Sequence, residues 1–278
     1  MNSRRITEDR CGLLKPTRGG IFQRALTCLK RHPMPVRAHF EHSLVLTYAF
    51  PRELLDPLLP PGLLLDNFGN FGFVAIAMVQ ARDLRSACLP AFAGRDLFMT
   101  GYRIFARYKT KAGRTLRGLR ILRSDTNQKW MAFFGNYLTH YNYQVADTKM
   151  FASADRLEIQ IDTPQAAADL HVRADLSAIC DAPPPGSPFT NLREARLFAG
   201  PLPFTFDYEN ETRSIILIEG VRSHWRPRPV KVEVLKATFL EQPPFNRVTP
   251  ILANAFHVAN IPYEWKRGRR EILTPICT

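Results

Sequence analysis

The 278-residue sequence has few cysteines and no long hydrophobic run. Its five cysteines are widely spaced, with no C-x-x-C pair and an odd total, which is typical of a reducing compartment. The longest apolar run, residues 71–79, is about half as long as a membrane-spanning helix requires. Arg24 interrupts the apolar stretch at 21–29, and no small-residue cleavage site follows it. We therefore expect a cytoplasmic protein without a membrane span.

Several common catalytic motifs are missing as well. The sequence has no H-E-x-x-H, P-loop, G-x-S-x-G or G-x-G-x-x-G pattern, so the usual metalloprotease, nucleotide-binding and serine-hydrolase functions lack local support. On a strand, His39 and Glu41 share a face while His42 points away, and two ligands do not make a zinc site. We predict no metal and no cofactor.

Positive charge is abundant but local. The net charge of +13 comes from a +6 segment at 1–33 and a +8 segment at 102–124, with a nearly neutral remainder. Strand alternation places Tyr102 and Tyr108 on the face opposite Arg103 and Arg107, so aromatic stacking and phosphate contacts would not share a surface. Nucleic acid is therefore not the expected partner.

The apolar pattern predicts many strands and few helices. Alternating or continuous apolar residues favour strands over the following ranges: 39–50, 71–80, 102–109, 115–124, 156–161, 169–176, 204–208, 213–219 and 230–240. A helix is predicted over 125–141, capped by Asp125 and with a buried apolar face, and a shorter one over 191–198.

The order of these elements predicts an α+β protein. We expect a basic N-terminal extension at 1–34 and one domain at 35–278, because neither a repeat nor a long linker divides the rest of the chain. The main feature of that domain would be a large, mostly antiparallel sheet.

Short motifs give this pattern a family resemblance. They are Leu-Pro-Pro-Gly-Leu at 59–63, Leu-Asp-x-Phe-Gly at 65–69, Gly-Phe-Val at 72–74, the run 125–143, and His-Trp-x-Pro at 224–227 leading to Val234. Over 35–265 the chain resembles the uncharacterised YqjF-like family, which is related to acetoacetate decarboxylase. The resemblance implies an antiparallel sheet closed into a cone or barrel around a cavity, and a homo-oligomer.

The decarboxylase motif itself is incomplete. That enzyme forms a Schiff base through a lysine in the pattern Gly-Arg-Glu-x-x-Gly-x-Pro-Lys-Lys. Gly113, Arg114 and Gly118 match it, whereas Ile121 and Leu122 stand at the two lysines. Thr115 also replaces the glutamate and Arg120 the proline. Acetoacetate decarboxylase activity is therefore not expected.

Arginine, histidine and tyrosine supply the remaining candidate chemistry. Arg103, Arg107 or Arg120 could hold a carboxylate or phosphate if it faced a cavity, although a solvated basic face is the simpler interpretation. His140 is the candidate acid or base, although a histidine near a helix end commonly complements the helix dipole. The further candidate ligand-binding residues are Tyr141, Tyr143, Glu219 and His224.

Two functions stay open at this point. The first is binding of a small, anionic organic molecule, with action on a carbonyl compound that needs no Schiff-base lysine. The second is a non-catalytic ligand sensor or interaction module, which the missing lysines favour. Whether the protein is an enzyme is left undecided by the sequence.

Overall fold

The computed structural model describes residues 28–178, 180–200 and 202–273. The strands of the main sheet are β1 (Val36–Pro51), β2 (Leu63–Leu65), β3 (Phe71–Ser86), β4 (Arg95–Lys109), β5 (Thr115–Thr126), β6 (Tyr143–Val145), β10 (Phe204–Glu209), β11 (Ser214–Arg222), β12 (Arg228–Pro229), β14 (Ile251–Trp265) and β15 (Arg269–Ile272). A second sheet contains β7 (Asp147–Ala152), β8 (Arg156–Asp162), β9 (Leu170–Asp175) and β13 (Lys231–Ala237).

Short helices connect the strands. The α-helices are α2 (Arg52–Leu55), α3 (Lys129–Leu138) and α4 (Leu192–Ala199). The 3-10 helices are η1 (Asp56–Leu58), η2 (Ala91–Ala93), η3 (Pro164–Ala166), η4 (Thr238–Glu241) and η5 (Phe245–Arg247).

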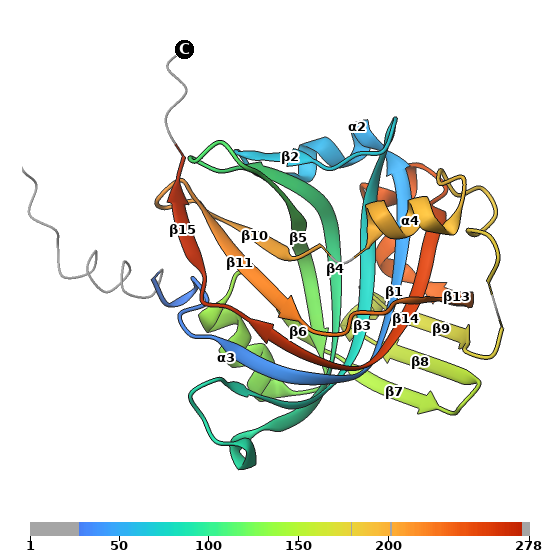
Figure 1. Ribbon diagram of the computed structural model, residues 1–278, viewed down its shortest axis with the longest axis horizontal. Coiled ribbons are helices and arrows are strands. Elements are labelled where there is room, and N and C mark those ends of the chain that lie inside the picture. The colour runs from blue at the N-terminus through green and yellow to red at the C-terminus, as the bar shows by residue number, and fades with distance from the viewer. Residues whose placement is uncertain (1–27, 179, 201, 274–278) are drawn as a thin grey trace, which may run out of the picture.

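The main sheet closes on itself. Its path runs β14-β1-β3-β4-β5-β10-β11, and β11 pairs again with β14, so these seven strands form a ring (Figure 1). Most neighbours are antiparallel, and β5 makes parallel pairs with β6 and β10. The expected α+β class, with a large and mostly antiparallel sheet closing in a cone-like way, is confirmed. The long strand β14 was missed because Asn254, Asn260 and Pro262 interrupt its apolar pattern.

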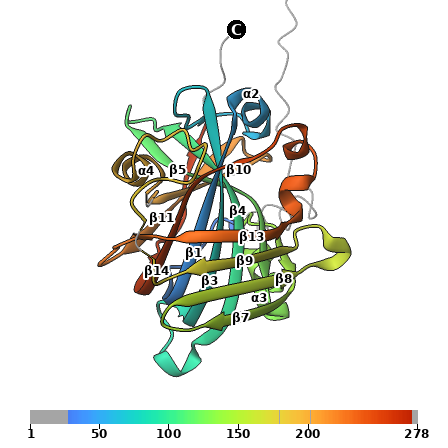
Figure 2. The ribbon, with the colours of Figure 1, turned by 90° about the vertical axis from the view of Figure 1, so that its right-hand side faces the viewer.

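The second sheet covers one outer side of the ring, as Figure 2 shows. Alternate residues of β3 and β4, including Ile76, Met78 and Tyr102, share one core with Ile159 and Val172 of the second sheet. Because successive side chains of a strand point to opposite faces, the residues between them face the inside of the ring. The alternation of 102–109 therefore fixes which side chains of β4 can reach the interior.

Helix α3 departs from the prediction. It spans Lys129–Leu138, and Asp125 does not cap it, because Asp125 is the buried end of β5. The small residues Ala132 and Gly135 make the buried contacts. Phe133, Phe134 and Tyr137 stay 61%, 54% and 45% exposed. A Cβ on Gly135 would come within 2.4 Å of the Tyr143 ring, so the helix approaches β6 closely there, while Trp130 and Met131 are half-buried against neighbouring hydrophobic residues.

The described end of the N-terminal extension packs on the ring. The His32 amide donates a hydrogen bond to the Leu138 carbonyl, and the His32 carbonyl accepts one from Gly268. Arg31 pairs with the buried carboxylate of Glu209 at 2.6 Å. None of the described helices combines the length and apolar character that crossing a membrane requires.

Candidate functional site

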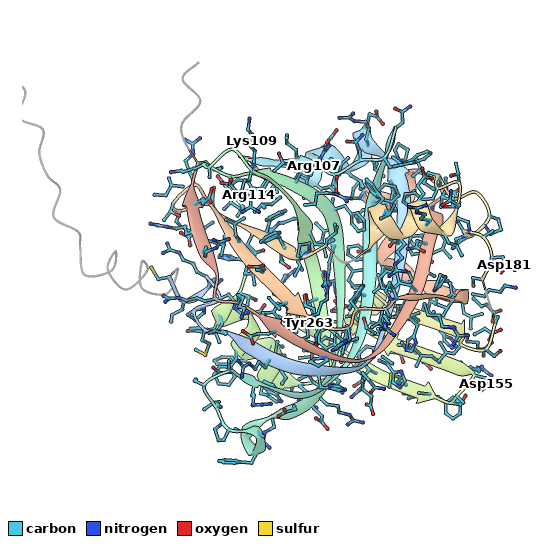
Figure 3. The ribbon with its side chains drawn as sticks, in the orientation of Figure 1. Arg107, Lys109, Arg114, Asp155, Asp181 and Tyr263 are labelled. Atoms are coloured by element: carbon cyan, nitrogen blue, oxygen red, sulfur yellow. The ribbon has the colours of Figure 1, made fainter. Side chains whose placement is uncertain are left out.

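A cavity of about 110 Å³ lies inside the ring. Its walls come from β1, β3, β4, β5, β11 and β14, and small inward residues such as Ala75 and Ala77 leave the space. Its lining residues with a polar side-chain atom are Ser43, Thr100, Arg103, Ser124, Tyr141, Tyr143, Thr205, Arg222, Trp225, Tyr263 and Trp265. Figure 3 labels Tyr263 in the middle of the molecule, away from Lys109 and Arg114 at the end of the β4–β5 hairpin.

Arg103 enters this cavity because of its place on β4. Its neighbours Tyr102 and Ile104 face the outer core, so the period of two turns Arg103 inward together with Phe105. The guanidinium lies against Gly101, where a Cβ would come within 2.7 Å of the Arg103 Nε atom. Glycine at 101 therefore makes room for the charged group.

Arg222 enters from the end of β11. Its Cζ atom lies 4.6 Å from the Trp225 ring centroid and 5.8 Å from that of Tyr263, both within cation–π range. Burial lowers the pKa of Arg222, and the positive charge of Arg103 acts in the same direction. The two cations therefore repel each other inside one cavity.

The cavity also collects buried donors without acceptors. Among the described residues, Thr100 Oγ1, Arg103 Nε, Tyr141 Oη and Trp225 Nε1 have no hydrogen-bond partner. Each of these four side chains lines the cavity. Burial raises the pKa of Tyr141 well above its usual value, so its hydroxyl stays protonated and can donate. A buried donor left without an acceptor costs about 1–3 kcal/mol, so the gathering of four such donors makes this cavity the candidate ligand site.

No described lining residue is acidic, and none is lysine or histidine. Ile121 lines the cavity at the position that resembles the first motif lysine, while Leu122 packs against the main core. The described cavity therefore offers positive charge and donors but no amine for a Schiff base.

Tyr141 and Tyr143 are two further sequence candidates that line the cavity. Asn136 of α3 fixes Tyr143 by accepting from its amide at 2.7 Å and donating to its carbonyl at 2.8 Å. Burial raises the pKa of Tyr143 to about 12, against the opposite effect of Arg103.

Arg120 and His140 lie in a separate, paired cluster. Arg120 forms an ion pair of 2.5 Å with Asp207, whose side chain is 1% exposed. Burial lowers the pKa of His140, while the charge of Asp207 acts to raise it. Neither Arg120 nor His140 is among the cavity-lining residues. The structure thus separates the candidate acid or base from Arg103.

The other three candidates also lie outside the cavity lining. Arg107 donates to the Leu65 carbonyl at 3.1 Å and lies 3.4 Å from the Asp66 carboxylate. Glu219 and His224 are exposed.

Arg222 was missed, although the sequence carries a signal for it. The prediction chose Glu219 and His224 at the end of the strand, but the period of two puts Gly220 and Arg222 on the face opposite Glu219. Ile218 lies on the same face, which makes Arg222 a half-buried cation at the end of an apolar row. No sequence pattern pointed to Trp225 or Tyr263, since Trp225 lies in a loop and Tyr263 reaches the cavity through closure of the strand ring.

Comparisons with known proteins agree with this architecture. A crystal structure of acetoacetate decarboxylase from Legionella pneumophila matches at a TM-score of 0.58 with 13% identity, covering 86% of this chain and 88% of that one. The enduracididine biosynthesis enzyme MppR in complex with pyruvate matches at 0.54 with 12% identity, covering 86% and 90%. An acetoacetate decarboxylase-like enzyme from Sphingomonas wittichii RW1 matches at 0.53 with 11% identity, covering 87% and 94%.

At these identities the solved structures establish a shared fold. No match was found among curated proteins. A family model described as "Uncharacterized conserved protein (COG2071)" matches residues 37–267, which include the whole ring except the first residue of β1. The chain therefore belongs to this conserved DUF2071 family and has an acetoacetate decarboxylase-like fold.

Proposed function

We propose that the protein binds a small organic anion, specifically a carboxylate, in the cavity at Arg103 and Arg222. The observation that carries this proposal is the lining of one cavity: it holds two guanidinium groups, unpartnered donors that include Arg103 Nε, and no acidic side chain among its described residues. A carboxylate would supply acceptors for these donors and reduce the repulsion between the cations.

The cavity volume limits what can enter it. About 110 Å³ is less than the roughly 150 Å³ of an engineered cavity that holds benzene. The space therefore suits a carboxylate with a few attached atoms. The fold relative MppR has been solved with pyruvate, which is a carboxylate of this size and supports the choice of ligand class.

Chemistry on the ligand is a second, weaker proposal. A Schiff-base route has no support, because Ile121 faces the cavity where the motif has a lysine. Proton transfer by His140 would need a path from the Asp207 cluster to the cavity, and Tyr141 is the adjacent residue that lines it. A non-catalytic sensor needs no such path, and we favour binding alone.

The cellular setting is part of the same proposal. The exposed aromatic side chains of α3 support a homo-oligomer, since large exposed apolar patches commonly mark interfaces. The cysteine pattern supports a cytoplasmic location. Native mass spectrometry of the protein purified without added ligand would report the oligomeric state and any bound small molecule together.

Titration calorimetry with pyruvate and butanoate tests the binding site. We expect Arg103→Met and Arg222→Met each to weaken binding by about 10- to 100-fold, because each removes a charge-assisted interaction. Arg114→Met is the matched control, since Arg114 is exposed on the β4–β5 hairpin, and it should bind as the wild type does. Equal affinity of all three variants, or no binding of any carboxylate, would overturn the proposal.

A further inference from the structure

A second pocket lies directly beside the arginine cavity. It has a volume of about 320 Å³ and lies between α3, the ends of β3 and β4, and the segment that precedes β1. Its lining is mainly apolar and includes Val36, Leu84, Trp130, Met131, Phe134 and Leu138. The apolar pocket thus differs sharply in chemistry from its neighbour.

The two spaces are separated by a single layer of side chains. Met99, Tyr141, Tyr143 and Trp265 line both of them. Each of these residues therefore presents one surface to the arginines and another to the apolar pocket.

The two tyrosines of this layer are held differently. Asn136 holds the backbone of Tyr143, and Gly135 packs closely against the Tyr143 ring. The Tyr141 hydroxyl has no hydrogen-bond partner among the described residues. Of the described glycines, Gly135 packs against the Tyr143 ring and none packs against the Tyr141 ring, so we place the passage between the two spaces at Tyr141 rather than at Tyr143.

We propose that the carboxylate held at Arg103 and Arg222 carries an apolar tail, which passes Tyr141 and occupies the apolar pocket. The ligand is then an amphiphilic carboxylic acid. This inference rests on the proposed function, because the arginine cavity supplies the site for its head group.

The sizes of the two spaces fit this division. The arginine cavity accommodates a carboxylate and little else, whereas the apolar pocket is about twice the roughly 150 Å³ that holds benzene. From the comparison with the benzene-sized cavity, we expect a tail of about six to twelve carbons. The exclusion of water from such a lining favours a hydrocarbon chain or an aryl group over a polar one.

A chain-length series tests the inference. Butanoate, hexanoate, octanoate and decanoate are titrated into the full-length protein by calorimetry, with ligand-observed NMR for the weakest acids. We expect the affinity to rise about fourfold per added methylene until the pocket is full. Octanol should bind much more weakly than octanoate, because it lacks the charge that the arginines hold.

Two variants separate the head site from the tail site. Met131→Trp fills the apolar pocket and should abolish the preference for octanoate while leaving butanoate binding unchanged. Leu197→Trp is the control, because Leu197 is 72% exposed on α4 and lines neither space. Circular dichroism and thermal melting identify a variant that fails to fold, and Leu138→Phe then replaces Met131→Trp.

The outcomes distinguish this inference from the proposed function. Binding that depends on Arg103 but does not change with chain length would overturn the amphiphilic ligand and leave the carboxylate site intact. Octanol and octanoate binding with equal affinity, independent of Arg103, would also overturn it, since the apolar pocket would then act alone. Absence of binding by acids of every length would overturn the carboxylate site itself.

Discussion

Arg103 and Arg120 belong to the same β4–β5 hairpin but lie in opposite electrostatic surroundings. Arg120 forms an ion pair with the buried carboxylate of Asp207. Arg31 and Glu209 form a second ion pair in the same cluster. Arg103 ends in a cavity with a second cation, Arg222, and with no acidic residue in its described lining. The first region is neutralised by the fold, and the second is not.

The comparison shows why a count of charges does not locate a binding site. The segment 102–124 carries eight basic residues and no acidic one. In the folded protein Arg107 and Arg117 lie beside Asp66, and Arg123 pairs with Asp125. Four of the six arginines in this segment thus lie beside carboxylates, whereas Arg103 lines the cavity and Arg114 is exposed on the hairpin.

The comparison is tested most strongly by removing one arginine from each region. Arg120→Met should lower the free energy of unfolding by about 3–5 kcal/mol, because it leaves the buried Asp207 without its partner. Arg103→Met should lower it by no more than about 1 kcal/mol, since it orphans no acid and removes a buried charge. Urea denaturation followed by circular dichroism measures both values.

Arg114→Met again serves as the exposed control and should change the free energy of unfolding by less than about 0.5 kcal/mol. Similar losses for Arg120→Met and Arg103→Met would contradict the assignment of one paired and one unpaired region.

Acid should affect folding and ligand binding differently. Burial lowers the pKa of His32 and of His257 to about 4 in the folded protein. Below the ordinary histidine pKa of about 6.5, these two histidines bind protons in the unfolded chain but not in the folded protein. The free energy of unfolding therefore falls as the pH falls from 6.5 to 4. Each histidine contributes up to about 3 kcal/mol to this loss. Urea denaturation across this pH range measures it.

Carboxylate affinity, by contrast, should change little from pH 8 to pH 6, because arginine stays charged and the ligand stays ionised. His257→Gln can preserve a polar contact to His42, whose Nδ1 atom lies 3.1 Å from His257 Nε2. This variant should lose less unfolding free energy than the wild type as the pH falls. His224→Asn, at an exposed position, should leave the loss unchanged. A steep drop in affinity above pH 6 would show that a histidine takes part in binding.

The smallest effect concerns the position of Arg103 rather than its charge. In Gly101→Ala the new methyl group would meet the guanidinium and displace it, because the side chain can move more easily than the strand. We expect carboxylate affinity to fall about fivefold to tenfold, with little change in thermal melting. Calorimetry with butanoate measures the change.

Gly101→Ala in the Arg103→Met background gives the control for this effect. The double variant should bind butanoate as Arg103→Met alone does, because the two substitutions act on the same interaction. Additive losses would mean that Gly101 supports the site in another way.

Much of the fold could be predicted from the sequence. The continuous apolar run at 71–80 identified β3 and the alternation along 102–109 identified β4, and the turn at Gly113 identified the hairpin from β4 to β5. The second sheet was not separated from the first, because period-two alternation is the same on a ring strand and on a covering strand. The burial of the α3 face was predicted wrongly, since periodicity does not reveal which face of a helix must approach its neighbour closely.

The candidate site could be predicted only in part. Arg103, Tyr141 and Tyr143 were named from the sequence and line the cavity, whereas Arg222 is distant in sequence and was missed. His140 and Arg120 looked equivalent to the cavity residues because the sequence does not show where Asp207 lies. Their roles in binding or catalysis stay predictions.

By itself the sequence determined most of the long strands, the alternation that turns Arg103 away from Tyr102, and the isoleucine that stands where a Schiff-base lysine would be needed. These are local properties, fixed by the period of a strand and the chemistry of one side chain. Only the tertiary structure decided that Arg107, Arg117 and Arg120 are neutralised, because their carboxylate partners Asp66 and Asp207 lie far away along the chain. Closure of the ring brings two arginines that are distant in sequence, Arg103 and Arg222, into the lining of one cavity.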